Sequence, residues 1–178
     1  MKIIVVNGAP MVGKDQFCNY CMNYMTQKGI RGGIISTIDI VKKIAVMLGW
    51  DELKTPEDRK FLSDLKKLLT DWKDVPFTYT KNSINETYRH FINQLKTPPD
   101  RVLFFVHCRE PEEIERFKKE LGAITVIIRR EEYEQMNQSN SSDENVLNYE
   151  YDYEIWNNKE LDDLQLEAIK FVDKMVKF

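Results

Sequence analysis

The sequence predicts an α/β fold built on a parallel sheet that helices cover on both faces. The first observation is that strand-like apolar runs alternate with helical stretches along the chain, as in sheets whose parallel strands are joined by crossover helices. The second is a glycine-rich loop directly behind the first apolar run and ahead of a helical stretch. The strand-like runs fall at residues 2–7, 32–36, 101–107, 123–129 and 151–156.

The loop after the first run reads Gly-Ala-Pro-Met-Val-Gly-Lys-Asp and carries the G-x-x-x-x-G-K pattern of a phosphate cradle (P-loop, Walker A). Its glycines let the backbone turn tightly and approach an anion, and Lys14 can reach the outer phosphates of a nucleotide. An ordinary strand-to-helix turn with two glycines is the alternative. The predicted nucleotide-binding residues are Gly8, Ala9, Pro10, Met11, Val12, Gly13, Lys14, Asp15 and Gln16.

The residue after Lys14 is Asp15, where the usual motif has a serine or threonine that ligates magnesium. A carboxylate can also hold a hard cation, but without the metal it adds negative charge beside the phosphates. Gln16 follows, so a hydroxyl displaced by one position is not available either. We therefore predict a marked metal requirement, with Asp15 as the metal ligand.

Helical stretches lie between the strand-like runs, and several end at a glycine. They run from Lys14 to Lys28, Asp39 to Leu48, Glu57 to Trp72, Ser83 to Leu95, Glu110 to Leu121 and about Lys159 to Lys177. Residues 131–149 are polar and poor in β-branched side chains, which predicts a mobile lid or a partly disordered loop over about 130–149. No repeat or linker divides the 178 residues, so we expect a single domain over 1–178.

The composition, 42% hydrophobic and 31% charged, is too polar for membrane spans. The N-terminal apolar run is short and follows one lysine, so it indicates a strand and not a signal peptide, and a cytoplasmic location is expected. A net charge of −3 without a basic, aromatic-interleaved stripe argues against polymeric nucleic acid as a partner. The sequence leaves a homodimer open.

The three cysteines cannot all pair, in agreement with a reducing compartment. Cys18 and Cys21 form a C-x-x-C inside the helix after the loop, where Phe17 and Tyr24 share a face with Cys21. No second pair of ligands is present to complete a zinc site. Core cysteines are therefore the better interpretation.

Ligands of open parallel sheets bind beyond the carboxyl ends of the strands, so residues that follow strands are the candidates for chemistry. After the second run, Asp39 can contact a substrate or serve as a helix N-cap, and Lys42 lies on the same helical face. After the third run, His107 stands where magnesium-dependent phosphate-loop proteins usually have an acid. Arg109 can clamp a substrate phosphate or pair with Glu113.

Arg129 and Arg130 follow the fourth run at the start of the predicted lid. An arginine there can neutralise charge on a transferring phosphoryl group, although both side chains could instead be solvated and face Glu131 and Glu132. Arg59 is a weaker phosphate candidate on a helix. After the fifth run, Asn157 and Asn158 are able to read a purine edge.

These residues resemble the phosphate-loop kinases of the nucleoside-monophosphate kinase group, most closely the deoxynucleoside-monophosphate-kinase-like proteins of phages and bacteria. Gly8 through Asp15 reproduce the G-x-x-x-x-G-K-D of that family. Asp39 and Lys42 match its A-D-x-x-K-like segment, and Arg59 and Leu62 match its R-x-x-L-Q helix, with a serine in place of the glutamine.

Further motifs of the family follow in the second half of the chain. The D-x-R-x-x-x-E segment of the family corresponds to His107, Arg109 and Glu113. Its S-E lid segment corresponds to Ser142 and Glu144, and its closing D-x-x-I-x-N motif corresponds to Asp152, Ile155 and Asn157. The first acid is replaced by His107. The resemblance implies a three-layer α/β/α P-loop NTPase fold with a five-stranded parallel sheet in the order 2-3-1-4-5. It also implies an acceptor-binding helical region at about 39–97.

The resulting hypothesis is transfer of the γ-phosphoryl group of ATP, with Mg²⁺, to a small phosphorylated acceptor, a (deoxy)nucleoside monophosphate. Lys14 would bridge the β- and γ-phosphates and Asp15 would ligate the metal, while Arg109 and Arg129 would hold phosphates. Asp39, with Lys42 and Arg59, would bind the acceptor. The alternatives are a kinase for another small acceptor, such as dephospho-coenzyme A, and a catalytically silent ATP-binding module.

Overall fold

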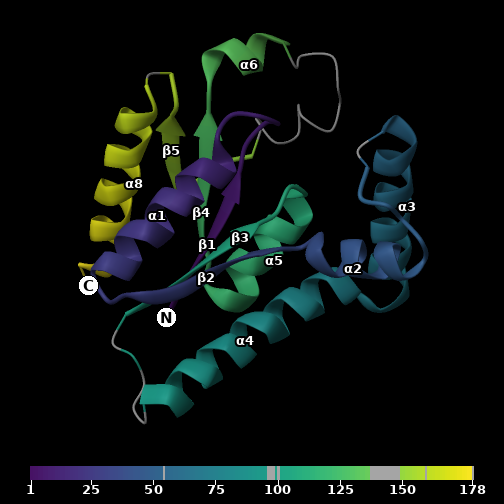
Figure 1. Ribbon diagram of the computed structural model, residues 1–178, viewed down its shortest axis with the longest axis horizontal. Helices are drawn as coiled ribbons and strands as arrows, with labels where there is room; N and C mark the ends of the chain where they lie inside the picture. The colour runs from purple at the N-terminus through teal and green to yellow at the C-terminus, as the bar shows by residue number, and fades with distance from the viewer. Residues whose placement is uncertain (54, 96–98, 100, 137–148, 159, 178) are drawn as a thin grey trace. The chain divides into compact units, whose positions relative to one another are not determined.

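The computed structural model describes the whole chain apart from residues 54, 96–98, 100, 137–148, 159 and 178 (Figure 1). The chain divides into two compact units, Met1–Ile34 with Phe91–Phe178, and Ile35–His90. The first unit carries the glycine-rich loop and most of the sheet, and the second carries the helices that follow the second strand. The single domain expected over 1–178 stays a prediction.

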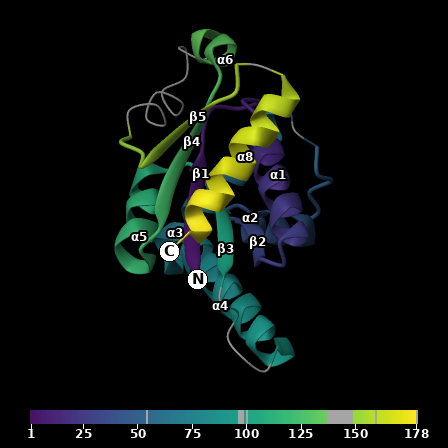
Figure 2. The same ribbon diagram turned by 90° about the vertical axis from the view of Figure 1, so that its left-hand side faces the viewer.

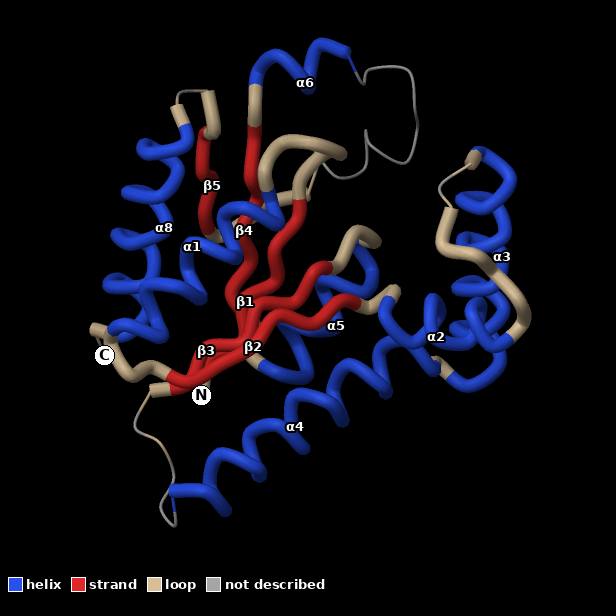
Figure 3. The backbone as a smooth tube through the Cα atoms, viewed as in Figure 1, coloured by secondary structure: helices blue, strands red, loops and turns tan. Residues whose placement is uncertain are grey.

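The sheet has five strands in the order β2-β3-β1-β4-β5, and this confirms the predicted fold class and strand order (Figure 3). The strands are β1 (Lys2–Asn7), β2 (Arg31–Ser36), β3 (Val102–His107), β4 (Ile124–Arg129) and β5 (Tyr153–Trp156). The central strand β1 is parallel to β3 and β4, with Val6 opposite His107 on one side and Val126 on the other. Strand β5 is parallel to β4 and starts two residues later than predicted.

Helices lie on both faces of the sheet in the first unit. Helices α1 (Lys14–Gln27) and α8 (Leu161–Val176) pack side by side over one face, and α5 (Pro111–Leu121) covers the other (Figure 2). Because both faces are covered, β1, β3 and β4 are buried almost along their whole length, as their continuous apolar runs predict. Cys18 and Cys21 are buried in the core between α1 and the sheet, which confirms the core interpretation.

The second unit contains α2 (Asp39–Met47), α3 (Pro56–Lys73) and most of α4 (Val75–Leu95). Helix α3 starts with a capping box, in which the backbone N–H of Asp58 donates to Thr55 Oγ1 and the backbone N–H of Thr55 donates to Asp58 Oδ2, both at 3.1 Å. Helix α3 packs against α2.

Helix α4 begins eight residues before the predicted start at Ser83, so that boundary was wrong. Pro76 is the second residue of the helix, where a missing N–H costs nothing. The buried side chains of Phe77, Thr80 and Ile84 follow at helical spacing and stabilise the early turns.

The structure differs from the prediction at the first residues of the predicted lid. Residues Glu131–Met136 form a short helix, α6, directly after β4, where a mobile or disordered loop was expected. The remaining lid positions 137–148, with Ser142 and Glu144, lie outside the described residues. None of the helices in the described part of the chain is both long and apolar enough to cross a membrane.

Candidate phosphate-binding site

The loop between β1 and α1 has a backbone that only glycine can follow at two positions. Gly8 has φ +143° and Gly13 has φ +99°, values that L side chains rarely adopt. A Cβ at Gly8 would lie 2.3 Å from the backbone oxygen of Ile128, and one at Gly13 would lie 2.6 Å from Asn157 Nδ2. The loop is therefore pressed against the ends of β4 and β5, and the two glycines of the motif are required by this close approach.

Two buried asparagines hold the loop in place. Asn7 Oδ1 accepts from the N–H of Gly8 at 2.8 Å, and Asn7 Nδ2 donates to the backbone oxygen of Arg109 at 3.1 Å. Asn157 Nδ2 donates to the backbone oxygen of Val12 at 2.9 Å. We call Asn7 and Asn157 the asparagine clamp. Because Asn157 is 6% exposed and its amide is engaged with the loop, it supports the loop from the β5 side; its predicted contact with the nucleotide stays a prediction.

Asn7 was not singled out in the sequence. The signal was available, because a polar residue that ends an otherwise apolar strand just before a glycine needs a hydrogen-bonding partner if it is buried. Asn7 is 2% exposed and bridges three segments, since its Nδ2 also donates to the hydroxyl of Tyr151 at 2.9 Å. The asparagine thus connects the loop to the end of β3 and to the residues before β5.

The side chain of Lys14 folds back onto the loop that precedes it. Its Nζ donates to the backbone oxygens of Gly8 and Ala9, both at 2.7 Å, and the side chain is half-buried. Helix α1 begins at the same residue, and in the described chain no side chain caps its first turn. The leading N–H groups of a helix lack intrahelical partners and favour an anion. The loop therefore brings an ammonium group and a helix N-terminus to one place.

Asp15, His107 and Cys18 form a row beside the loop. His107 Nδ1 lies 3.3 Å from Asp15 Oδ1, and His107 Nε2 lies 3.2 Å from Cys18 Sγ. The Asp15 side chain is 87% exposed, the His107 side chain is 19% exposed, and Cys18 is fully buried. Burial, with a smaller contribution from the Asp15 charge, raises the pKa of the Cys18 thiol far above its ordinary value. Cys18 is therefore a protonated thiol.

One exposed carboxylate beside the loop is typical of a magnesium site that is completed by phosphates and water, and not of a metal site built from protein ligands alone. Among the residues that the structure describes, no three histidine, cysteine, aspartate or glutamate side chains are grouped as a metal site. Magnesium typically keeps several waters and binds one or two carboxylates together with substrate phosphates. Asp15 fits that role by its chemistry, its exposure and its position after Lys14.

The arginines after β3 and β4 have different surroundings. Arg109 is exposed, and the carboxylate of Glu113, its suggested partner, is buried and accepts from Cys108 Sγ at 3.3 Å. Arg129 Nη1 lies 3.1 Å from Glu154 Oε1, and its guanidinium stacks 4.7 Å from the ring centroid of Trp156. These partners come from β5 because the register places Trp156 opposite Arg129.

The alternative interpretation of the paired arginines holds for one of them. Arg130 Nη2 lies 3.3 Å from Glu132 Oε2, and its guanidinium stacks over the ring of Tyr133. This is the local surface pairing that the neighbouring glutamates suggested. Arg129 has a different described partner, Glu154 of the adjacent strand.

Three of the four predicted acceptor-binding residues belong to the second unit, and the fourth, Arg109, belongs to the first. Asp39 is the first residue of α2 and follows the N-cap, Ile38, so its prediction as N-cap was wrong. Its Oδ2 accepts from the backbone N–H of Ser36 at 2.8 Å, which closes the turn between β2 and α2. Lys42 is exposed on α2, and Arg59 is exposed on the first turns of α3. The acceptor roles of Asp39, Lys42 and Arg59 stay predictions.

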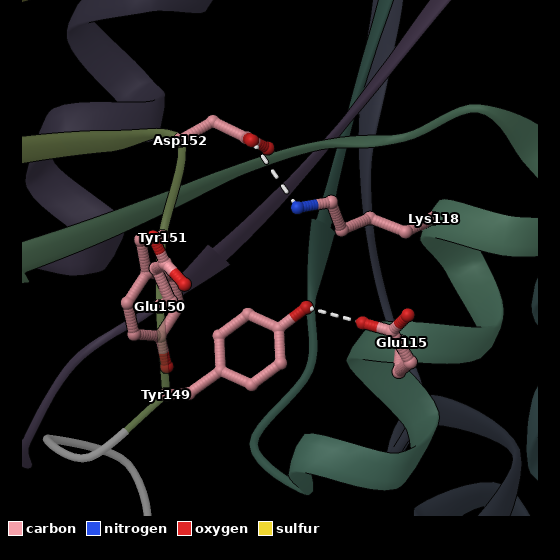
Figure 4. Close-up of a pocket in the computed structure, with 6 residues that line it drawn as sticks. All are labelled: Glu115, Lys118, Tyr149, Glu150, Tyr151 and Asp152. Carbon is pink, nitrogen blue, oxygen red and sulfur yellow. Dashed lines mark hydrogen bonds and ion pairs between the residues drawn. The ribbon is translucent and has the colours of Figure 1, made fainter.

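A separate polar hollow lies between α5 and the residues before β5 (Figure 4). Asp152 Oδ2 accepts from both the N–H and the Oγ1 of Thr125 at 2.8 Å, and Asp152 Oδ1 pairs with Lys118 Nζ at 3.2 Å. The hydroxyl of Tyr149 donates to Glu115 Oε2 at 2.9 Å. Burial, followed by this hydrogen bond to a carboxylate, raises the pKa of Tyr149 to about 12. The residues that line the hollow are Glu115, Lys118, Tyr149, Glu150, Tyr151 and Asp152.

Comparison with known proteins gives structural likeness only. No family model matches the chain, and no curated protein matches it in sequence. A mutant of the Mycobacterium tuberculosis APS kinase CysC matches at 12% identity and a TM-score of 0.49, covering 97% of this chain and 96% of its own. Shikimate kinase from Aquifex aeolicus matches at 12% identity and 0.49, covering 97% of each chain.

A de novo designed protein with a P-loop NTPase fold matches at 14% identity and a TM-score of 0.41, covering 100% of this chain and 96% of its own. Scores and identities this low support no conclusion about function. The P-loop NTPase-like architecture follows from the chain itself, since its strand order is β2-β3-β1-β4-β5 and the glycine-rich loop joins β1 to α1.

Proposed function

We propose that the chain is an ATP- and Mg²⁺-dependent phosphotransferase that moves the γ-phosphoryl group of ATP to a nucleoside monophosphate. The observation that carries this proposal is the shape of the loop between β1 and α1. Gly8 and Gly13 lie where no side chain fits, the asparagine clamp fixes the backbone, and Lys14 and the first turn of α1 meet at its mouth. An ordinary turn needs none of these features.

Lys14 is the residue that changes partners in this reaction. Its ammonium is held by two neutral carbonyl oxygens, and a triphosphate offers it charged oxygens, which make stronger hydrogen bonds. Lys14 would therefore leave Gly8 and Ala9 and bridge the β- and γ-phosphates. The backbone N–H groups from Val12 onward would hold the remaining phosphate oxygens, since the helix N-terminus favours an anion.

Asp15 would hold Mg²⁺ together with oxygens of the phosphates and with water. A bound Mg²⁺ neutralises charge that builds on the transferring group. Without the metal, the carboxylate of Asp15 repels the triphosphate. Nucleotide binding to this chain is therefore expected to depend on the metal more strongly than binding to a loop that ends in a neutral hydroxyl.

Arg129 and Arg109 would complete the charge neutralisation. Arg129 is paired with Glu154 and stacked on Trp156, and both contacts lie near the protein surface, where an ion pair contributes little. A transferring phosphoryl group can compete with that pair. Arg109 extends from the end of β3 and would contact the acceptor phosphate. Asp39, Lys42 and Arg59 would bind the acceptor from the second unit.

The acceptor class rests on the resemblance of the loop and the following motifs to nucleoside-monophosphate kinases. A second candidate, an ATP-binding module without phosphoryl transfer, is favoured by one observation. The acid that usually ends the third strand is replaced by His107, so one carboxylate fewer is available for the metal. A kinase for a different small acceptor, such as dephospho-coenzyme A, is a further alternative on the same loop.

The test is a panel of acceptors with the purified chain, ATP and Mg²⁺. Ribo- and deoxyribonucleoside monophosphates and dephospho-coenzyme A are offered one at a time, and ADP and the phosphorylated acceptor are measured. Lys14→Ala is the matched control, and we expect it to lower the rate by about 10²-fold or more, the usual effect of removing one charge-stabilising donor. Its circular dichroism spectrum should match the wild type.

The product that forms with wild type alone names the acceptor. Transfer to dephospho-coenzyme A, and not to any nucleoside monophosphate, would replace the proposed acceptor. ATP binding without any product would favour the silent module. Full turnover by Lys14→Ala would remove the loop from the mechanism altogether.

A further inference from the structure

His107 occupies a position that connects the loop helix to the sheet. It ends β3 next to β1, where its register partner is Val6, just before the loop. Asp15 and Cys18 lie three residues apart on α1, so their side chains emerge from one face of that helix. The imidazole lies between them, with Nδ1 3.3 Å from Asp15 Oδ1 and Nε2 3.2 Å from Cys18 Sγ.

The thiol determines which ring nitrogen carries the proton. Cys18 is fully buried, and burial raises its pKa well above the ordinary value, so the thiol keeps its proton and acts as a donor. When the S–H donates to Nε2, that nitrogen is the acceptor, and the ring N–H is on Nδ1. This N–H faces Asp15.

A ring N–H that donates to Asp15 orients the carboxylate. The Asp15 side chain is 87% exposed and would otherwise adopt several rotamers, whereas a carboxylate that ligates a metal is usually held by a hydrogen bond from a neighbouring residue. A second acid at position 107 would add charge to the site. The histidine instead fixes the single acid that the loop supplies.

From this geometry we propose that His107 is a positioning residue: held by Cys18 on one side, it donates from Nδ1 to Asp15 and orients that carboxylate for a divalent cation bound with the nucleotide. The inference rests on the proposed function, because it assumes that Asp15 ligates Mg²⁺. It gives a role to the residue that replaces the usual acid.

The experiment measures metal-dependent nucleotide binding and not turnover. Mg²⁺ is titrated into full-length protein with a fluorescent ATP analogue, and the Mg²⁺ concentration at half-maximal binding is compared for wild type, His107→Ala, His107→Asn and His107→Gln. An asparagine amide nitrogen lies near the Nδ1 position, and a glutamine amide lies near the Nε2 position. Comparing the two variants therefore distinguishes the effect of the contact with Asp15 from the effect of the contact with Cys18.

We expect His107→Ala to raise the half-maximal Mg²⁺ concentration about tenfold, the lower end of the effect of removing a residue that orients a metal ligand. His107→Asn should stay within about twofold of wild type, and His107→Gln should behave as His107→Ala does. Binding of the analogue without metal should be unchanged in all three variants, and this separates metal positioning from a general disturbance of the loop. Electron paramagnetic resonance of Mn²⁺ in place of Mg²⁺ provides a second, direct measure of the bound metal.

Equal Mg²⁺ dependence of His107→Asn and His107→Gln would overturn the inference, and so would a wild-type value for His107→Ala. If His107→Ala does not fold, the two amide variants decide. If wild type binds nucleotide and transfers the phosphoryl group, and the substitutions of His107 do not change the Mg²⁺ dependence, this inference is removed and the proposed function stands. A wild type that binds no nucleotide with Mg²⁺ removes both.

Discussion

The two ends of the sheet hold their strands with different chemistry. At the carboxyl end, the asparagine clamp makes hydrogen bonds to the loop backbone, and the nearby charges of Lys14 and Asp15 lie outermost. At the amino end, the carboxylate of Asp152 holds the start of β4 through Thr125 and pairs with Lys118. Polar side chains support the backbone at both ends; they are buried at the carboxyl end, whereas Asp152 at the amino end is exposed.

The difference teaches why amides support the loop. A buried carboxylate at the positions of Asn7 or Asn157 would repel a phosphate and could not donate to the backbone oxygens of Arg109 and Val12, whereas an uncharged amide donates to them. At the amino end, where no anion is expected, the acid of Asp152 has its own basic partner in Lys118. At the carboxyl end, Lys14 is held by backbone oxygens and Asp15 lies beside His107, whereas at the amino end Asp152 forms an ion pair with Lys118.

The strongest test of this comparison exchanges one glycine at each end for alanine. Gly8→Ala should lower the free energy of unfolding by about 3 kcal/mol, because the new Cβ meets the backbone oxygen of Ile128 at 2.3 Å in a strained conformation. Gly122 also has positive φ, +60°, but a Cβ there meets nothing within 4 Å. Gly122→Ala should therefore cost only about 1 kcal/mol. Urea unfolding measures both, and equal costs would contradict the close approach at Gly8.

The next test removes one side of the clamp. Asn157→Ala leaves the buried oxygen of Val12 without its donor, and we expect a loss of about 1–3 kcal/mol in stability together with weaker ATP binding. Asn158→Ala is the matched control, because that side chain is exposed and accepts only from the N–H of Glu131 among the bonds described. It should cost less than about 0.5 kcal/mol. Similar ATP affinities for the two variants would show that the clamp does not shape the loop.

At the amino end, Asp152→Asn should have a smaller effect that depends on pH. Burial alone would raise the pKa of Asp152, but hydrogen bonds from Thr125 and the Lys118 charge bring it below the ordinary 3.8. A lowered folded-state pKa gives stability that is complete above the unfolded-state pKa and is lost as the pH falls through the folded value. Because the side chain is 38% exposed, we expect about 1 kcal/mol between wild type and variant at neutral pH.

That difference should shrink as the pH falls below about 4 and should disappear only below the lowered folded-state pKa, where the carboxylate is protonated in both states. Urea unfolding of wild type and Asp152→Asn at several pH values measures it. A difference that stays constant from neutral pH into acid would rule out the ionised carboxylate as its source.

The smallest expected effect is that of Tyr149→Phe. Loss of the hydrogen bond to Glu115, on the half-exposed rim of the hollow, should cost about 0.5 kcal/mol at neutral pH. Because the folded-state pKa is raised to about 12, this contribution is complete below the unfolded pKa near 10 and is lost as the pH rises toward 12. At about pH 11, the ultraviolet absorbance of tyrosinate should be the same in the folded variant and in wild type. A lower absorbance in the variant would mean that Tyr149 already ionises at that pH.

Much of the architecture was predictable because its signals are local. The continuous apolar runs of β1, β3 and β4, and the glycines that end α1 and α5, gave strand and helix boundaries within a residue or two. Helix α4 was the exception, since it begins at Val75, eight residues before the predicted start at Ser83. The strand order came from the resemblance and not from the runs themselves, because apolar runs do not say which strands are neighbours.

In the site, the sequence by itself determined the loop. Gly8, Gly13, Lys14 and Asp15 lie within eight residues of one another in the chain, and their chemistry depends on the local backbone geometry. Only the tertiary structure decided which distant residues touch that loop. The donor to Val12 is 145 residues away, and Arg129 meets Glu154 of the adjacent strand. His107 lies between Asp15 and Cys18 because β3 is paired with β1 in one register. Such contacts depend on strand order and register, and no local pattern encodes them.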